Sequence, residues 1–349
     1  MTGVQHLTVG PDEADQRLDR WLRRQFPQLG QGRIEKMCRT GEVRIDGARA
    51  KASSRVAPGQ SIRVPPLPDA EAAAPDAVAR PAPPAPRVDA AAREALLRAV
   101  VFRDDHMIVL NKPAGLAVQG GTGQHLHLGA MLEVLRFGRD DDPRLVHRLD
   151  RDTSGLLVLA RTGQAAVALS RAFRTRAVEK IYVALVAGRP SPEMGTIRLA
   201  LAKTETGGKA SKMKTYDPDE ADGVEGARHA VTDYRVIDHA GNRAAWVALR
   251  PVTGRTHQLR AHMAAIWHPI AGDGKYGGSR QDNQGEGWGA GLGQALSRKL
   301  HLHAARLVLP HPVSGKRMTF SAPLPEHMAR SWEFFGWNER DLPQPVFPD

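Results

Sequence analysis

A stretch rich in proline and alanine divides the sequence before its first third ends. The 29 residues 65–93 contain eight prolines and eleven alanines, and none of them is aromatic. Proline at this density favours an extended spacer, so a linker is favoured over the alternative, an unusually long active-site loop. We therefore predict two folded units, residues 1–66 and 95–335. A linker over residues 67–94 joins them, and a tail over residues 336–349 follows.

The overall composition is that of a globular protein, with 41% hydrophobic and 25% charged residues. No apolar run approaches the ~18 residues that a membrane-spanning helix needs, so we expect no membrane association. Acidic residues occupy the segment where a secretory signal would have its apolar core, and the single cysteine, Cys38, excludes internal disulfides. Both observations favour the cytoplasm. The formal net charge of +11 favours a polyanionic partner, most often nucleic acid.

The N-terminal unit combines two short helices with short strands. Leu18, Trp21 and Leu22 recur at helical spacing, and the alternating segment 42–47 ends in an Asp-Gly turn typical of a hairpin. Basic residues outnumber acidic ones by five over residues 1–66. These basic residues could simply form a solvated helix face. Positive charge dominates too strongly, however, for the side chains to neutralise one another in i,i+4 ion pairs. We predict that the helices contact RNA through Arg17, Arg20, Arg33, Lys36 and Arg39.

The C-terminal unit contains many apolar runs of strand length and few helical segments. Strands are predicted at residues 100–102, 107–110, 156–160, 181–186, 231–236, 244–249 and 305–309, with a helix over residues 165–173. This order favours an α+β fold in which helices flank a largely antiparallel, mixed sheet, rather than a doubly wound fold.

Two polar clusters in this unit could carry chemistry. His147, Arg148 and Asp150 lie in a turn that runs into the apolar strand 156–160. The second cluster, residues 251–262, brings together Arg255, His257, Arg260 and His262. If a helix opens near Thr256, Leu259 and Met263 pack inward while Arg260 extends toward the site. The alternatives from spacing alone are a backbone-capping turn for the first cluster and a nucleic-acid contact patch for the second.

Residues 15–66 resemble a known RNA-binding module. The segments Gln16–Leu22, Lys36–Gly47 and Val56–Gln60 are similar, in the same order, to the alpha-L RNA-binding domain of a ribosomal small-subunit protein. The resemblance implies binding to structured RNA and no chemistry of its own.

The rest of the chain resembles the RluA-type pseudouridine synthases over about residues 100–325. The segment 147–155 matches the signature His-Arg-Leu-Asp-x-x-Thr-Ser-Gly. The further motifs follow in the order of the family, at residues 111–116, 180–182, 253–260, 268–273 and 302–304. An RNA-binding module ahead of such a domain is similar to the RluC and RluD branch, which modifies large-subunit ribosomal RNA. The resemblance implies the pseudouridine synthase fold.

The resemblance also implies roles for individual residues. Asp150 matches the catalytic aspartate, Tyr182 the tyrosine that stacks on the uracil, and Arg260 the arginine that pairs with the aspartate. Arg148 matches the arginine that fills the space left by the flipped base. We assign His147, Arg255 and His257 to the same RNA-contacting, base-flipping group. The reaction adds and oxidises nothing, so no cofactor or metal is expected.

Two other functions stay open on the sequence alone, as does the kind of RNA. The first is a non-catalytic RNA-binding or ribosome-assembly protein, which could dispense with Asp150. The second is a nucleoside hydrolase, which needs a second carboxylate; Asp152 is its candidate, and Asp273 is expected to be more remote. Transfer RNA is the alternative substrate to ribosomal RNA. The glycine-rich segment 279–294 is longer than the family pattern leads us to expect. The basic segment 203–214 has no assigned role in RNA binding. We expect a monomer.

Overall fold

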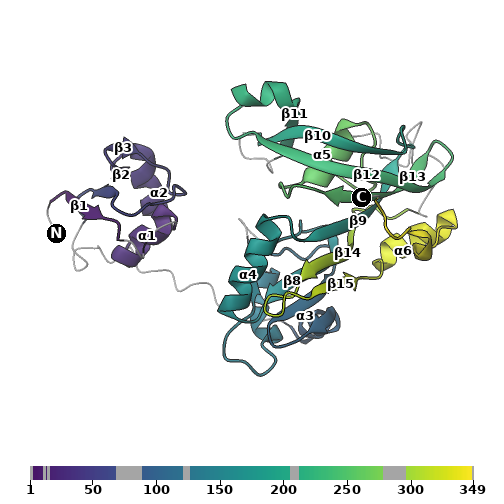
Figure 1. Cartoon of the computed structure of the whole chain (residues 1–349), viewed down its shortest axis with the longest axis horizontal. Helices are drawn as coiled ribbons and strands as arrows, with labels where there is room; N and C mark the ends of the chain where they lie inside the picture. Colours follow the sequence, from purple (N-terminus) through teal and green to yellow (C-terminus); the bar gives the residue numbers. More distant parts are fainter. Residues whose placement is uncertain are drawn as a thin grey trace. The chain divides into compact units, whose positions relative to one another are not determined.

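The structure is a computed structural model, and it describes residues 3–10, 13, 16–67, 89–120, 126–204, 212–277 and 296–347. The chain separates into two compact units, Met1–Pro84 and Ala85–Asp349 (Figure 1). Three segments of interest fall wholly or partly outside the described residues: most of the predicted linker, the middle of the basic segment 203–214, and the glycine-rich segment 279–294.

The N-terminal unit packs two helices against a four-stranded antiparallel sheet of order β1-β4-β2-β3. In chain order its elements are β1 (Gln5–Thr8), α1 (Leu18–Gln25), α2 (Gln31–Thr40), β2 (Arg44–Ile45), β3 (Ala48–Arg49) and β4 (Ser61–Val64).

The predicted helical spacing and hairpin of this unit are confirmed. Leu18, Trp21 and Leu22 of α1 are completely buried, one turn apart on the same helix face. Between β2 and β3, Asp46 and Gly47 both have positive φ angles (49° and 79°), which a tight hairpin turn of type I′ requires.

The C-terminal unit contains the remaining elements. These are α3 (Ala90–Arg98), β5 (Val100–Arg103), β6 (Met107–Lys112), η3 (Leu128–Ala130), η4 (Leu132–Leu135), β7 (Arg144–Leu145), β8 (Ser154–Ala160), α4 (Gly163–Arg174), β9 (Glu179–Ala187), β10 (Met194–Lys203), β11 (Met213–Tyr216), η5 (Pro218–Gly223), β12 (Arg228–Ala240), β13 (Ala244–Pro251), α5 (Gln258–Ala265), β14 (Leu302–Pro310), β15 (Arg317–Ser321), α6 (Glu326–Phe335) and η7 (Glu339–Asp341). None of the helices in the described ranges is long and apolar enough to cross a membrane.

One mixed sheet carries this unit. Its main path runs β11-β10-β12-β13-β9-β14-β8-β6-β5, with β15 on β14 and β7 on β8. Every pairing along the path is antiparallel except that of β14 with β8. The predicted α+β class and largely antiparallel sheet are therefore confirmed. β14 joins a half made of β5, β6 and β8 to a half made of β9–β13 (Figure 1).

Helices cover both faces of the sheet, which is why β8 is buried along its whole length. Successive side chains of a strand point to opposite faces. Leu156 and Val158 of β8 accordingly pack in one core with α4, whereas Leu157 and Leu159 pack in another with α3, η3 and η4. In the other half of the sheet, α5 and α6 each contribute to a separate core.

Two predicted domain limits are wrong in detail. Helix α3 begins at Ala90, with the Asp89 carboxylate accepting a hydrogen bond from Ala92 N–H as its N-cap, so the end of the predicted linker is helical. The predicted tail over residues 336–349 includes residues that pack in the core: Trp337, Val346 and Phe347 are each more than nine-tenths buried. The bulky apolar residues explain this packing, since their burial stabilises the fold.

Three buried histidines make the stability of this unit sensitive to acid. Burial lowers the pKa of His262, His301 and His303 from the ordinary 6.5 to about 4. Between these values the unfolded chain binds protons that the folded chain does not, so stability is present above pH 6.5 and is lost as the pH falls toward 4. We expect the urea midpoint of unfolding to be clearly lower at pH 5 than at pH 7. An equal midpoint at both pH values would contradict the burial of these rings.

Candidate active site

The loop that carries Asp150 is held where β8 begins. Gly155 in β8 has a φ of +109°, and a Cβ atom there would lie 2.4 Å from the carbonyl oxygen of Ala304 in β14. Only glycine permits this approach, which brings β14 and β8 together in parallel. The completely buried ammonium of Lys112 donates hydrogen bonds to the carbonyl oxygens of Pro113, Leu116 and Arg151 (2.8, 2.9 and 3.0 Å). The Lys112 hydrogen bonds tie the Asp150 loop to the loop after β6, and the packing of Gly155 on Ala304 ties it to β14.

His147 is a further anchor of this loop. Its Nε2 accepts a hydrogen bond from Val158 N–H (2.8 Å), and its ring stacks on Phe173 at a centroid distance of 4.1 Å. Burial, together with the charge of Lys180, lowers the pKa of His147 to about 3. The ring is therefore neutral at physiological pH, and its Nε2 is already hydrogen-bonded to the backbone of the protein itself.

The second cluster is shaped by the turn that precedes α5. Helix α5 begins at Gln258, two residues later than the predicted start, with His257 in a left-handed backbone conformation (φ +53°) just ahead of it. The buried Gln258 side-chain oxygen accepts hydrogen bonds from Thr253 Oγ1 (2.7 Å) and Arg255 N–H (3.0 Å). As predicted, Leu259 and Met263 pack inward. A bulky residue with positive φ is uncommon, and such strain is often found at functional sites.

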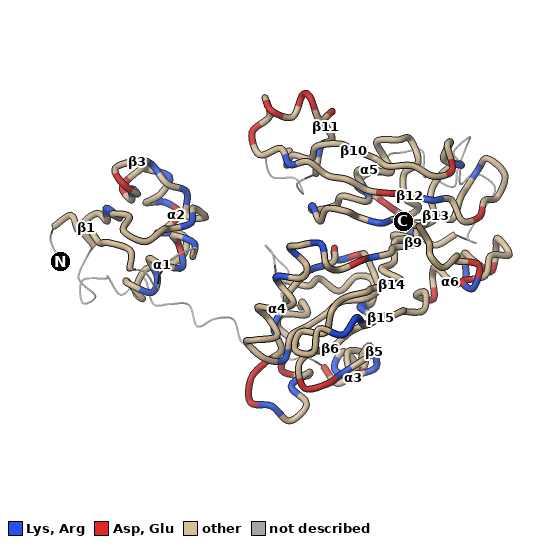
Figure 2. Tube along the Cα trace, in the orientation of Figure 1, with Lys and Arg blue, Asp and Glu red and all other residues tan. Residues whose placement is uncertain are grey.

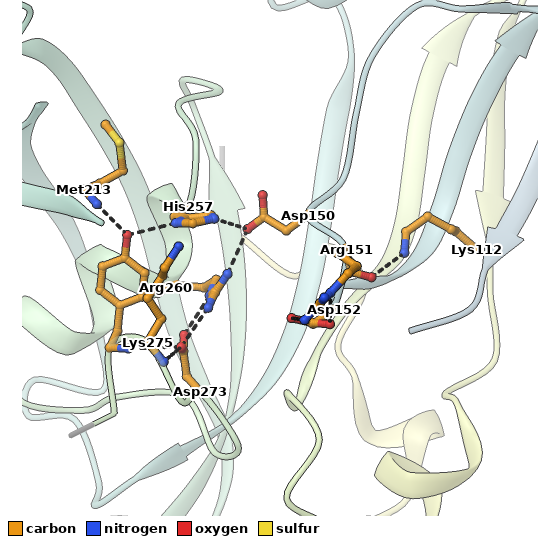
Figure 3. A network of polar contacts seen from close by, with 10 residues as sticks. Lys112, Asp150, Arg151, Asp152, Met213, His257, Arg260, Asp273 and Lys275 are labelled. Atoms are coloured by element: carbon orange, nitrogen blue, oxygen red, sulfur yellow. Dashed lines mark hydrogen bonds and ion pairs between the residues drawn. The ribbon is translucent and has the colours of Figure 1, made fainter. Parts of the chain in front are cut away.

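Arg260 connects two carboxylates at the centre of the site (Figure 3). Its Nε and Nη2 donate to the two oxygens of Asp273 (2.7 and 2.8 Å), and its Nη1 lies 3.4 Å from Asp150 Oδ2. The Asp273 side chain is fully buried and also accepts hydrogen bonds from the N–H groups of Lys275 and Tyr276. Burial alone would lower the pKa of Arg260, but its contacts with Asp273 and Asp150 raise it, so the guanidinium stays charged.

His257 approaches the same oxygen of Asp150 from another direction. Its Nε2 lies 3.8 Å from Asp150 Oδ2, and its Nδ1 lies 3.0 Å from the Tyr276 hydroxyl, which accepts a hydrogen bond from Met213 N–H (2.9 Å) (Figure 3). Burial, the largest effect, lowers the pKa of His257, although the Asp150 charge acts the other way. Asp150 thus faces a fixed cation and a ring that burial biases toward neutrality.

A cavity of about 290 Å³ opens beside Asp150. Tyr182, which is half-buried on β9, lines it together with Leu302 and Lys180. Burial raises the pKa of the Tyr182 phenol, and the charge of Asp150 adds to this rise, so the hydroxyl stays protonated at neutral pH. Aromatic and aliphatic surface beside a carboxylate–guanidinium pair suits a flat, polar ligand such as a nucleobase.

The seven residues predicted for the catalytic domain all line this cavity: Asp150, Tyr182, Arg260, Arg148, His147, Arg255 and His257. Arg255 is exposed, and its Nε donates to the carbonyl oxygen of His229 (3.1 Å). No cluster of three His, Cys, Asp or Glu side chains suited to a metal ion occurs among the described residues.

The five basic residues predicted to contact RNA lie in the other unit. All five are exposed on or next to α1 and α2, where Lys and Arg follow both helices (Figure 2). Arg17 forms an ion pair with Asp19 (2.7 Å), so part of its charge is offset.

Two expectations about the acidic residues are corrected by the geometry. Asp273, expected to be remote, forms the two shorter contacts of Arg260. Asp152, the candidate second carboxylate, instead pairs with its neighbour Arg151 at 3.0 Å. The one signal that could have singled out Asp273 is its position directly after Gly272, within one of the motifs of the family. Tyr276, which links Met213 to His257, carried no signal at all.

Comparisons with known proteins match both units of the chain to known families. A profile described as RNA pseudouridylate synthase matches residues 106–265, and an S4 domain profile matches residues 16–62. The chain is 36% identical to "Ribosomal large subunit pseudouridine synthase C" of Vibrio cholerae serotype O1, over 95% of this chain and 96% of that one. The protein of the same name from Escherichia coli K12 is 35% identical, over 94% and 95% of the two chains.

A solved structure supports the same relationship. "Human RNA Pseudouridylate Synthase Domain Containing 4" is 30% identical, covers 70% of this chain and 95% of its own, and has a TM-score of 0.57. The chain therefore belongs to the RNA pseudouridylate synthase family. It is an RNA pseudouridine synthase, an isomerase, with an N-terminal RNA-binding S4 domain.

Proposed function

We propose that this enzyme converts specific uridines of large-subunit ribosomal RNA to pseudouridine and that Asp150 is its catalytic carboxylate. The observation that carries the site assignment is the convergence of Asp150, Arg260 and Tyr182 on one cavity. The substrate assignment follows the relatives of nearly full length whose names specify the large ribosomal subunit. The proposal places the enzyme in the cytoplasm, where it acts as a monomer.

The reaction breaks the N1–C1′ bond of uridine, turns the uracil and joins its C5 to C1′; C5 loses its proton and N1 gains one, so the product is an isomer of the substrate. No electrons and no further group are needed, so the chain has to supply a carboxylate, a surface for the base and a site that excludes water. Asp150 supplies the carboxylate, which can attack C1′ or the base, or remove a proton at C2′. Its ion pair with Arg260 holds the carboxylate in place.

The remaining residues of the cavity hold the flipped uridine. Tyr182 offers its ring face to the uracil, and burial keeps its hydroxyl protonated. A base inside a folded RNA has to leave its stack at a cost of a few kcal/mol, and Arg148, at the wall of the cavity, is suited to occupy the space it leaves. Arg255 and His257 border the same cavity and complete the RNA contact. His147 acts by positioning the Asp150 loop, because its ring is already engaged by Val158 and Phe173.

The direct test is carbodiimide mapping of pseudouridine in ribosomal and transfer RNA from a strain that lacks this gene, with and without the gene restored. We expect one or more pseudouridines of large-subunit RNA to disappear and to return on restoration. Loss confined to transfer RNA would support the alternative substrate. An unchanged map in both RNAs would refute the proposed function in favour of a non-catalytic role in binding or ribosome assembly.

A separate prediction concerns the N-terminal unit, which we propose supplies affinity and target choice. A chain that starts at Asp89 keeps the N-cap of α3 and lacks the whole unit. Each phosphate that a protein neutralises on single-stranded RNA adds about 0.7 to the slope of log affinity against log salt. We therefore expect residues 89–349 to bind folded ribosomal RNA much more weakly and with a shallower salt slope than the full chain.

The control for this truncation is turnover of a short stem-loop at high concentration, which should persist because the catalytic cavity is intact. Equal affinities and salt slopes for the two chains on folded ribosomal RNA would contradict the prediction.

A further inference from the structure

A second, larger cavity also borders Asp150 and Arg260. Its volume is about 810 Å³, and its lining comes from the loop after β6, the Asp150 loop, the turn around Gly272 and the segment 298–300. Both cavities have Arg148, Leu149, Asp150, His257 and Arg260 in their linings. The reactive carboxylate therefore stands where the two cavities meet, and a ligand in one cavity can continue into the other.

The two cavities differ in chemical character. The first contains the rings of Tyr182 and Phe173 and the side chain of Leu302. The second has no Phe, Tyr or Trp in its lining, and its six Lys and Arg side chains outnumber its two carboxylates. The six are Arg148, Arg151, Arg260, Lys275, Arg298 and Lys299. A wall with Tyr and Phe rings suits a base, whereas a cationic cavity whose lining has no Phe, Tyr or Trp suits a phosphate.

Ion pairs inside the second cavity remove only part of its positive charge. Asp152 is engaged by Arg151 at 3.0 Å, and Arg260 is engaged by Asp150 and by Asp273. Arg298 and Lys299 form no ion pair with a described residue, and their side chains are exposed at the rim. Arg148 is also exposed and has no ion pair with a described residue, but the proposed function assigns it to the space left by the flipped base; Arg298 and Lys299 are then the cations best able to neutralise an incoming anion.

The backbone keeps these two cations close to the catalytic centre. Gly272 has a φ of +73°, and a Cβ atom there would lie 1.9 Å from the carbonyl oxygen of Lys299 and 2.9 Å from that of Arg298. Since the next residue is Asp273, which holds Arg260, the segment 298–299 packs directly against the turn that orients the catalytic ion pair. The packing of the backbone at Gly272 therefore fixes Arg298 and Lys299 at the rim of this cavity.

We propose that the second cavity binds the phosphodiester group next to the target uridine, with Arg298 and Lys299 as its main contacts. The inference rests on the proposed function, in which the uracil lies against Tyr182 and C1′ faces Asp150. With the base in the first cavity and the ribose at Asp150, the backbone of the RNA leaves the site through the second cavity. Holding that phosphate contributes binding energy next to the reacting ribose, so the two residues bind the substrate and take no part in bond making.

The test compares the full-length enzyme with the double variant Arg298→Ala/Lys299→Ala on an oligoribonucleotide that carries the uridine identified by mapping. We expect KM to rise by roughly tenfold or more, because charge-assisted hydrogen bonds to the phosphate are removed, with kcat changed far less. The slope of log affinity against log salt should become shallower by about 0.7 for each phosphate that is no longer neutralised. The matched control is Lys316→Ala/Arg317→Ala, which removes the same two charges from exposed positions that line neither cavity.

A neutral backbone substitution identifies the contact itself. Replacing the phosphodiester on either side of the target uridine, one at a time, by a methylphosphonate should raise KM of the wild-type enzyme at one of the two positions. The double variant should be insensitive to that same replacement. Equal sensitivity of wild type and variant, or a KM that the variant leaves unchanged, would overturn the inference. A wild-type enzyme that forms no pseudouridine in any RNA would instead refute the proposed function.

Discussion

Replacing Asp150 by asparagine is expected to abolish pseudouridine formation and to leave RNA affinity almost unchanged. The variant keeps the size of the side chain and one oxygen, but it loses the charge that faces Arg260 and the group able to attack or to accept a proton. Removing a residue of this kind typically costs about 10⁴-fold or more in turnover. We expect binding to rest instead on the S4 domain and on the other residues that line the cavity, which the substitution leaves unchanged.

The measurement is a single-turnover assay of pseudouridine formation beside an affinity titration with the same RNA. Asp152→Asn is the matched control, because Asp152 lies in the same loop but pairs with the exposed Arg151. We expect this control to retain most of its activity. A rate above a trace for Asp150→Asn would show that another group does the chemistry.

Replacing Arg260 by alanine is expected to destabilise the enzyme and to inactivate it. The change leaves the fully buried Asp273 and the mostly buried Asp150 without their shared cation. Removing one partner of a buried ion pair costs about 3–5 kcal/mol, because the remaining charge is desolvated and unpaired. The free energy of unfolding from urea titration should fall on this scale, and turnover should fall with it.

Two companion substitutions separate charge from geometry at this position. Arg260→Lys keeps the cation but cannot form two parallel hydrogen bonds with Asp273, so it should recover part of the stability and little of the activity. Asp273→Asn keeps Arg260 and Asp150 but weakens the contact that orients the guanidinium, so its kcat should fall more than its affinity for RNA. Wild-type turnover in Arg260→Lys would mean that catalysis does not need the two parallel hydrogen bonds between Arg260 and Asp273.

Much of the fold and the site could be predicted from local patterns. Apolar runs such as residues 156–160 mark buried strands, and the spacing of Leu18, Trp21 and Leu22 marks a helix face, because both patterns depend on neighbours along the chain. Asp150, Tyr182 and Arg260 are grouped in one site by the resemblance to the pseudouridine synthase family, whose motifs occur here in the same order. These three residues do line one cavity, so the motifs predicted correctly which residues lie together in the fold.

The features that the sequence patterns did not reveal depend on contacts between distant residues. The hydrogen bonds between Asp273 and Arg260 form only because the turn after α5 folds back along the helix. No periodic pattern in the sequence predicts that course of the backbone. The same holds for Tyr276 and Met213, which are 63 residues apart. Burial of Trp337 and Phe347 could not be inferred either, since a short segment after the last helix has no repeat to indicate which surface it covers.

The position of β14 in the sheet has a consequence for how a newly made chain becomes an enzyme. This strand lies between β9 and β8, yet it is translated after both of them. Asp150 precedes β8 in one half of the sheet, whereas Tyr182 on β9 and Arg260 on α5 belong to the other half. The two halves meet only when Leu302–Pro310 has left the ribosome and inserted between them. Pairing over such sequence separations is slow, and we expect a chain that ends before Leu302 to be unable to modify RNA. The site is therefore complete only in a chain that has been synthesised at least as far as Pro310 and in which β14 has paired with both β8 and β9.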